Sequence, residues 1–233
     1  MIELHNIDCM KAMKQMPDKA FDLAIVDPNY GRGEHGGVNR DSACLQKNGS
    51  RIFVSGNKYA KKSWDEKPAD STYFSEVIRV SRNQIIWGCN YYSGNFGPGR
   101  IVWDKVNDGS DQSNCELAYN SQTDRVDMFR FMWRGMMQGL SMFNGTTQQG
   151  NKALNEKRIH PTQKPVELYK WLLTNYAEKG WKILDTHFGS LSIGIACHDL
   201  GYDLTAFEID REYFEGGKTR LEEHQRQGKM VYV

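Results

Sequence analysis

Ile183-Leu184-Asp185-Thr186-His187-Phe188-Gly189-Ser190 runs from an apolar strand into a glycine-containing turn and on into a helix. The next apolar stretch, 204–207, likewise ends in an acid, Glu208. In open α/β sheets, ligands bind beyond the carboxyl ends of the strands, where glycine lets a ligand approach the backbone and an acid can accept ribose hydroxyls. The segment therefore predicts an α/β sheet with a ligand site at this edge. Turns of this kind also occur where nothing binds, and this segment alone does not separate the two cases.

Apolar stretches alternate with helical spacing on either side of that segment. Strands are expected over 2–5, 21–26, 84–87, 100–103, 181–184 and 204–207, and helices over 9–16, 71–81, 165–177, 190–200 and 213–227. Strands separated by helices predict a parallel, doubly wound sheet covered on both faces. The chain, 1–233, suits a single domain. Two stretches, 31–62 and 135–158, fit neither pattern and are expected to be long loops, which are usually functional or disordered.

The composition excludes several classes of protein. No apolar run is long enough to span a bilayer and no leader opens the chain, so no membrane contact is expected and a cytoplasmic location is the default. Five scattered cysteines, none spaced Cys-x-x-Cys, argue against a disulfide framework and a zinc ribbon. His187 and His198 lie near Cys197 but lack paired ligands, so no metal site is expected. The net charge of +1 does not by itself indicate a nucleic-acid partner, although basic residues cluster at 58–62, 125–134 and 152–158.

Two further segments have chemical character. Asp27-Pro28-Asn29-Tyr30 places a carboxylate and an aromatic ring at the end of the strand expected over 21–26. The same residues also suit an ordinary type I turn leaving a sheet. His160-Pro161-Thr162-Gln163-Lys164-Pro165 comes directly before a helix and has no obvious packing rationale. Its presence shifts the interpretation of the first turn toward function.

Together these segments resemble the amino-group DNA methyltransferases, which modify N6 of adenine or N4 of cytosine. The resemblance is to the permuted class, in which the catalytic half precedes the cofactor half. Residues 27–30 resemble the catalytic Asp-Pro-Pro-Tyr, 160–165 the linker before the cofactor half, and 185–190 the Asp-Pro-Phe-x-Gly-Ser cofactor loop. Asn6-Ile7-Asp8-Cys9 resembles the opening Gly-Asp-Cys segment, and Trp103-Asp104-Lys105 and Cys115-Glu116 also match family positions. The resemblance spans nearly the whole chain, and the order of the motifs is more specific than any one of them.

The resemblance implies a Rossmann-like, mostly parallel seven-stranded sheet with circularly permuted motif order, S-adenosylmethionine as cofactor and double-stranded DNA as substrate. The implied catalytic residues are Asp27, Pro28 and Tyr30. The implied cofactor-binding residues are Asp8, Cys9, Asp27, Lys164, Asp185, His187, Phe188, Gly189, Ser190, Glu208 and Ile209. The carboxylate of Asp27 and the carbonyl of Pro28 would accept the two N–H bonds of the target amine, with the flipped base stacked on Tyr30. Catalysis would then consist of positioning and electrostatics, without a metal.

Two positions depart from the family pattern. Asn29 replaces the second proline and loosens the turn, and Leu191 stands where a second glycine is usual, which is expected to tighten the approach of the cofactor. Both features favour an alternative, a catalytically weak nucleic-acid-binding relative. Methyltransferases that act on RNA or protein amides share a similar turn but generally place the cofactor loop first, whereas Asp27 here precedes Asp185.

DNA contacts are assigned to the two long loops by elimination. Stretch 31–62 carries Arg32, Arg40 and Arg51, which would line a phosphate path. Stretch 135–158 occupies the family's target-recognition slot, and its composition favours a polar disordered loop, although three of its side chains would suit reading of base edges: Gln148, Gln149 and Asn151. Its shortness is compatible with a homodimer that shares specificity.

The choice of base depends on the acid of the catalytic turn. Asp27 favours N6 of adenine, because a carboxylate is the stronger acceptor and N4-cytosine enzymes more often carry serine there. Methylation of N4 of cytosine is the alternative.

Overall fold

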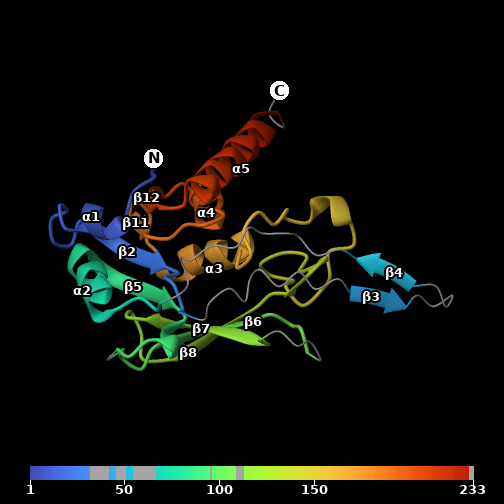
Figure 1. The fold of residues 1–233 in the computed structure, drawn as a ribbon, viewed down its shortest axis with the longest axis horizontal. Helices are drawn as coiled ribbons and strands as arrows, with labels where there is room; N and C mark the ends of the chain where they lie inside the picture. The colour runs from blue at the N-terminus through green and yellow to red at the C-terminus, as the bar shows by residue number, and fades with distance from the viewer. Residues whose placement is uncertain (32–41, 46–50, 55–66, 95, 109–112, 231–233) are drawn as a thin grey trace.

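The computed structural model describes residues 1–31, 42–45, 51–54, 67–94, 96–108 and 113–230. Among them, eight strands form a central sheet (Figure 1). Across the sheet, the order is β1 (Ile2–His5), β12 (Asp203–Phe207), β11 (Lys182–Asp185), β2 (Phe21–Val26), β5 (Ser81–Trp87), β7 (Cys115–Asn120), β6 (Arg100–Asp104) and β8 (Val126–Arg130).

The sheet is mostly parallel. The strands β1, β12, β11, β2 and β5 pair in parallel, and so do β6 and β8. Only β7 runs antiparallel to its neighbours, β5 and β6. The predicted α/β class with a mostly parallel sheet is confirmed, although the described sheet has eight strands rather than seven. The carboxyl ends of β12, β11, β2 and β5 therefore lie along one edge.

Helices cover both faces of the sheet. The helices are α1 (Cys9–Met13), α2 (Ser71–Val80), α3 (Val166–Tyr176), α4 (Ser192–Leu200) and α5 (Arg211–Met230). Along β2, Leu23 and Ile25 belong to a core that includes side chains of α3 and α4, whereas Ala24 and Val26 belong to a core that includes side chains of α1 and α2. A central strand that buries successive side chains on opposite faces is the signature of a doubly wound sheet.

The elements that the sequence predicts are all present, with ends that differ by a few residues. Strands β7 and β8 are not predicted. In β8 the apolar Val126 and Met128 lie on the exposed face and are 65% and 57% exposed, while Phe129 is buried. Apolar side chains therefore lie on both faces of β8, and the alternation of buried apolar and exposed polar residues that would reveal this edge strand is missing.

Both of the stretches predicted to be long loops contain short strands among their described residues. Stretch 31–62 contains an antiparallel pair, β3 (Ser42–Leu45) and β4 (Arg51–Val54), that lies apart from the central sheet in Figure 1. The rest of that stretch, including Arg32 and Arg40, lies outside the described residues.

Stretch 135–158 contains β10 (Met137–Gln138), paired with β9 (Trp133–Arg134), and the 3₁₀ helix η2 (Lys152–Leu154). The side chain of Gln138 donates to the carbonyl of Glu156 at 2.9 Å and accepts from its amide at 2.8 Å. The prediction of a disordered loop is therefore wrong here, because local strand pairing and a buried glutamine order the segment. No helix in the described part of the chain is both long and apolar enough to cross a membrane.

Candidate active site

The predicted site residues meet at the carboxyl edge of the sheet. Asp27 follows β2, Asp185 ends β11, and Glu208 follows β12, so adjacent strands bring three acids together. A cavity of about 320 Å³ opens there. Its wall includes every predicted cofactor-binding residue except Asp185: Asp8, Cys9, Asp27, Lys164, His187, Phe188, Gly189, Ser190, Glu208 and Ile209.

The loop between β11 and α4 is fastened to Glu208 through the backbone. The amide of Gly189 donates to Oε2 of Glu208 at 3.0 Å, and the amide of Asp210 donates to Oε1 at 2.8 Å. Burial raises the pKa of Glu208 despite these bonds. Gly189 has φ +50, and a Cβ there would lie 3.4 Å from the ring of His160, another wall residue. Glycine adopts this conformation without strain and leaves the cavity wall without a side chain here.

Asp185 lies behind the cavity wall. Its side chain is 2% exposed, and its Oδ1 accepts from the amide of His187 at 3.0 Å. Burial raises the pKa of Asp185 to about 8, with a further contribution from the charges of Asp27 and Glu208. Burial also lowers the pKa of His187 to about 4, so this imidazole is neutral near pH 7. Asp185 therefore acts on the cavity through the loop that it holds.

Leu191 adopts the left-handed conformation that favours glycine, with φ 58 and ψ 33. Its side chain is fully buried in the core and is not part of the cavity wall. The expectation that it tightens the approach of the cofactor is therefore wrong. The substitution acts instead through backbone strain at the start of α4.

In the turn 27–30, protein donors already engage both of the predicted acceptors. The hydroxyl of Tyr30 donates to Oδ1 of Asp27 at 2.5 Å, and the ammonium of Lys164 pairs with Oδ2. The carbonyl of Pro28 accepts from the hydroxyl of Tyr92 at 2.8 Å. The turn thus holds a carboxylate and a carbonyl that both accept hydrogen bonds from tyrosine hydroxyls.

A buried chain of charges continues from Asp27. Lys164, 4% exposed, lies 3.1 Å from Oε2 of Glu116, and the ammonium of Lys105 lies 2.5 Å from Oε1. Burial alone would raise the pKa of Glu116, but the two lysines outweigh it and lower the pKa to about 2. Burial alone would likewise lower the pKa of Lys164, but Asp27 and Glu116 raise it. Lys164 therefore pairs with two carboxylates in addition to lining the cavity, and Lys105 supplies the second positive charge.

A second cavity, of about 280 Å³, lies on the other side of this charge chain and is lined by Tyr30, Tyr91, Asn114 and Glu116 among others. The ring of Tyr30 stacks on that of Tyr91 at a centroid distance of 4.9 Å. Gly88 also lines the cavity and has φ +71, and a Cβ on it would lie 2.2 Å from the Tyr30 ring. Only glycine therefore fits beneath Tyr30 at this position.

Sequence reasoning missed Gly88, Tyr91 and Tyr92, which immediately follow β5. The signal was available, because β5 neighbours β2 and its carboxyl end lies at the same edge.

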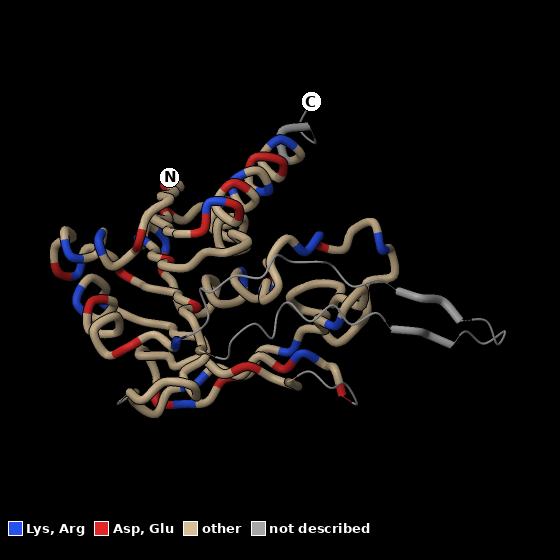
Figure 2. The backbone as a smooth tube through the Cα atoms, in the orientation of Figure 1, with Lys and Arg blue, Asp and Glu red and all other residues tan. Residues whose placement is uncertain are grey.

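The segment around 135–158 has charged, aromatic and amide side chains near its surface. Figure 2 shows the Lys and Arg positions distributed over the described part of the chain rather than gathered on one element. Arg130 pairs with Asp104 at 2.8 Å, and the guanidinium of Arg158 lies 4.4 Å from the centroid of the Trp133 ring. Phe143 is 86% exposed. Of the predicted base-reading residues, Gln148 and Asn151 are exposed and Gln149 is half-buried.

The comparisons with known proteins agree on one family. The family model for N6 and N4 methyltransferases, described as DNA methylase, matches residues 21–219. The type II methyltransferase M.HpaI of Haemophilus parainfluenzae is 24% identical, over 92% of this chain and 72% of its own length. The structure of the M1.HpyAVI–SAM complex is similar with a TM-score of 0.55 at 17% identity, covering 95% of this chain and all of its own. The cytosine-N4-specific PvuII DNA methyltransferase has a TM-score of 0.55 at 12% identity, covering 97% of this chain and 90% of its own.

Proposed function

The chain belongs to the DNA methylase family of N6 and N4 methyltransferases, and we propose that it methylates N6 of adenine in double-stranded DNA. S-adenosylmethionine is the cofactor of this family and of this chain. The observation that carries the proposal is the turn 27–30, which lies between two cavities. Asp27 lines the larger cavity and Tyr30 the smaller one.

The larger cavity fits the cofactor. The carboxylate of Glu208, held by two backbone amides, suits ribose hydroxyls, and the opening above Gly189 admits a ligand close to the backbone. Asp27 supplies negative charge for the cationic end of the ligand. When bound, S-adenosylmethionine supplies an electrophilic methyl group on a sulfonium. The remaining predicted binding residues would complete the wall, and Asp185 would position the loop at His187.

The target amine would bind at the catalytic turn. A carboxylate has about four lone-pair sites, so Asp27 can accept from the amine while Lys164 still orients it. The carbonyl of Pro28 becomes the second acceptor once the hydroxyl of Tyr92 gives way. Two acceptors on its two N–H bonds draw the nitrogen toward tetrahedral geometry and free its lone pair for reaction.

The smaller cavity would hold the flipped base. Enzymes that act on a base take it out of the stack and hold it against aromatic side chains. A base on the exposed side of Tyr30 would replace Tyr91 as its stacking partner, and such stacking contributes about 1–3 kcal/mol per base. Asn114 and Glu116 offer polar groups in the same wall.

The choice between adenine and cytosine rests on Asp27. A charged acceptor forms the stronger hydrogen bond, and the larger adenine ring gains more from stacking on Tyr30. N4 of cytosine is the second candidate, because it presents the same two N–H donors and the cytosine-N4-specific PvuII enzyme shares this fold.

Nucleoside mass spectrometry of duplex DNA methylated by the purified protein tests this choice. We expect N6-methyladenine. N4-methylcytosine without N6-methyladenine would overturn the choice of base, and cofactor binding without any methylated product would favour a catalytically weak DNA-binding relative.

We also propose the DNA contacts, the assembly and the location of the protein. The exposed groups of 135–158 would contact the duplex, with stretch 31–62 flanking them as the second DNA-binding segment. A homodimer is supported by the exposed apolar Val126 and Met128 on the edge strand β8, and light scattering of the purified protein would test it. A cytoplasmic location follows from the proposed DNA substrate.

A further inference from the structure

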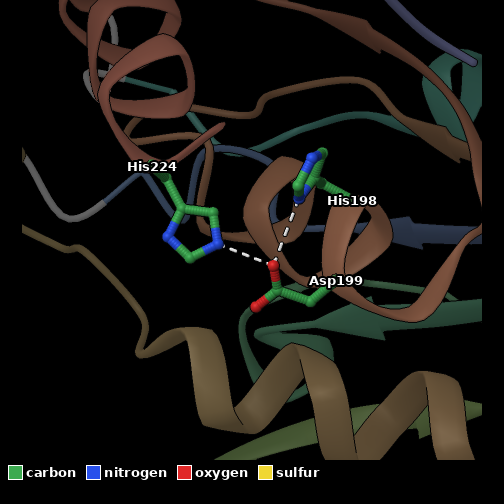
Figure 3. Close-up of side chains that lie close together, drawn as sticks. All are labelled: His198, Asp199 and His224. Atoms are coloured by element: carbon green, nitrogen blue, oxygen red, sulfur yellow. Dashed lines mark hydrogen bonds and ion pairs between the residues drawn. The ribbon is translucent and has the colours of Figure 1, made fainter. Parts of the chain in front are cut away.

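Three metal-ligating side chains meet where the last turn of α4 packs against α5, away from both cavities (Figure 3). His198 and Asp199 belong to α4, and His224 belongs to α5. Oδ1 of Asp199 lies 3.2 Å from Nδ1 of His198 and 2.6 Å from Nε2 of His224. One ligand atom from each residue lies within 4.8 Å of the others. The sequence pairs His198 with Cys197 and His187 as neighbours, whereas the fold brings it to His224 instead.

The carboxylate of this group is held in place. The ammonium of Lys170, on α3, lies 2.9 Å from Oδ2 of Asp199. Oδ2 is thereby engaged, and Oδ1 is the oxygen that faces the two imidazoles (Figure 3). Carboxylates that bind metals are characteristically oriented by such a second hydrogen bond, whose loss costs about 10- to 100-fold in affinity.

The donor set selects a class of cation. Two imidazole nitrogens with one carboxylate oxygen suit zinc, nickel, cobalt or copper, whereas magnesium and calcium prefer oxygen ligands throughout. Ligand atoms about 2.0–2.1 Å from a tetrahedral zinc lie roughly 3.4 Å apart. The imidazoles reach that spacing by rotation, because the side chains of His198 and His224 are 38% and 36% exposed. The same exposure admits water as a fourth ligand.

We propose that His198, Asp199 and His224 form a binding site for a divalent transition metal that fastens α5 to α4. The fastening would reach the cofactor loop, because one turn earlier on α5 the guanidinium of Arg220 donates to the carbonyl of Ser190 at 2.9 Å. The metal would have a structural role, since the site is remote from the catalytic turn.

Calorimetry of the full chain, stripped with a chelator and then dialysed, tests the site with zinc chloride and nickel chloride. We expect one equivalent to bind and the unfolding midpoint to rise, because a ligand that binds the folded state stabilises it. Magnesium chloride should do neither. Cobalt chloride provides a second readout, an absorption spectrum that reports the coordination geometry.

The variants His198→Gln and His224→Gln should each weaken zinc binding at least as much as loss of an orienting group does, about 10- to 100-fold. They should also abolish the rise in the unfolding midpoint. His5→Gln is the matched control, because His5 is exposed and outside the cluster, and it should bind zinc as the wild type does. Unchanged zinc affinity in His224→Gln, or no binding by the wild type, would overturn the proposal.

Discussion

Two pairs of acids in this site are held by different kinds of partner. Glu208 and Asp185 are bound by backbone amides of Gly189, Asp210 and His187. Asp27 and Glu116 are instead bound by side chains, above all by Lys164, which lies 137 residues from Asp27. The first arrangement is built largely from the loops that follow two adjacent strands, while the second exists only when distant segments have packed. A substitution in the first arrangement should therefore have a local effect. A substitution in the second should disrupt all of its contacts together.

Replacing Lys164 should produce the largest effect. Lys164→Met removes a buried cation that two half-buried carboxylates share, and breaking such a pair costs up to about 3–5 kcal/mol of folding free energy. Urea unfolding measures the loss, and Lys157→Met, at an exposed lysine, is the control. A loss below that of the control would show that the charge chain does not act as a unit.

Asp27→Ala should follow in size. Methyl transfer should fall about 10²–10³-fold, the usual cost of removing a contact made in the transition state. S-adenosylmethionine binding should stay within a few-fold of wild type, because the other wall residues remain. Single-turnover transfer and calorimetry measure the two quantities on the same preparation. Methyl transfer at nearly the wild-type rate would show that Asp27 is not a catalytic residue.

Glu208→Ala tests the arrangement in which backbone amides hold the acids. It should weaken S-adenosylmethionine binding by about 1.5–3 kcal/mol, the value of a charged hydrogen bond. Glu215→Ala, at an exposed glutamate of α5, is the matched control. Calorimetry decides the point, and equal dissociation constants for the two variants would place the ribose elsewhere.

Taken per pH unit, the smallest effect is the pH dependence at Asp185. Its folded-state pKa of about 8 lies above the ordinary value of 3.8, so between these values the folded state binds more protons than the unfolded state. Its contribution to stability is therefore fully present below about pH 4 and is lost as the pH rises to about 8, by at most about 1.4 kcal/mol per pH unit. Asp185→Asn, which keeps the acceptor for His187, should unfold with a flatter dependence on pH. Parallel curves for the two proteins would contradict this.

The same contrast explains what the sequence predicts. Strand ends and glycines mark Asp27, Asp185 and Glu208 because the rule that places them is local in sequence. The partnership of Lys164 with Glu116 has no local signature, since it depends on β7, a strand that the apolar pattern does not reveal. Leu191 is a residue whose position in a motif is predicted but whose side-chain location is not. Its position is predicted from the motif, but only packing tells that its side chain enters the core.

The donors at the catalytic turn carry a consequence for discrimination among bases. The hydroxyls of Tyr30 and Tyr92 donate to Asp27 and Pro28, so the resting protein contains stand-ins for the two N–H groups of an amine. Whatever displaces them must itself bring hydrogens. Thymine O4 and guanine O6 bring lone pairs, which would face the lone pairs of a carboxylate and a carbonyl. If residues 27–30 receive the target amine as proposed, thymine O4 and guanine O6 would be disfavoured there by repulsion, before any contact with flanking sequence is made.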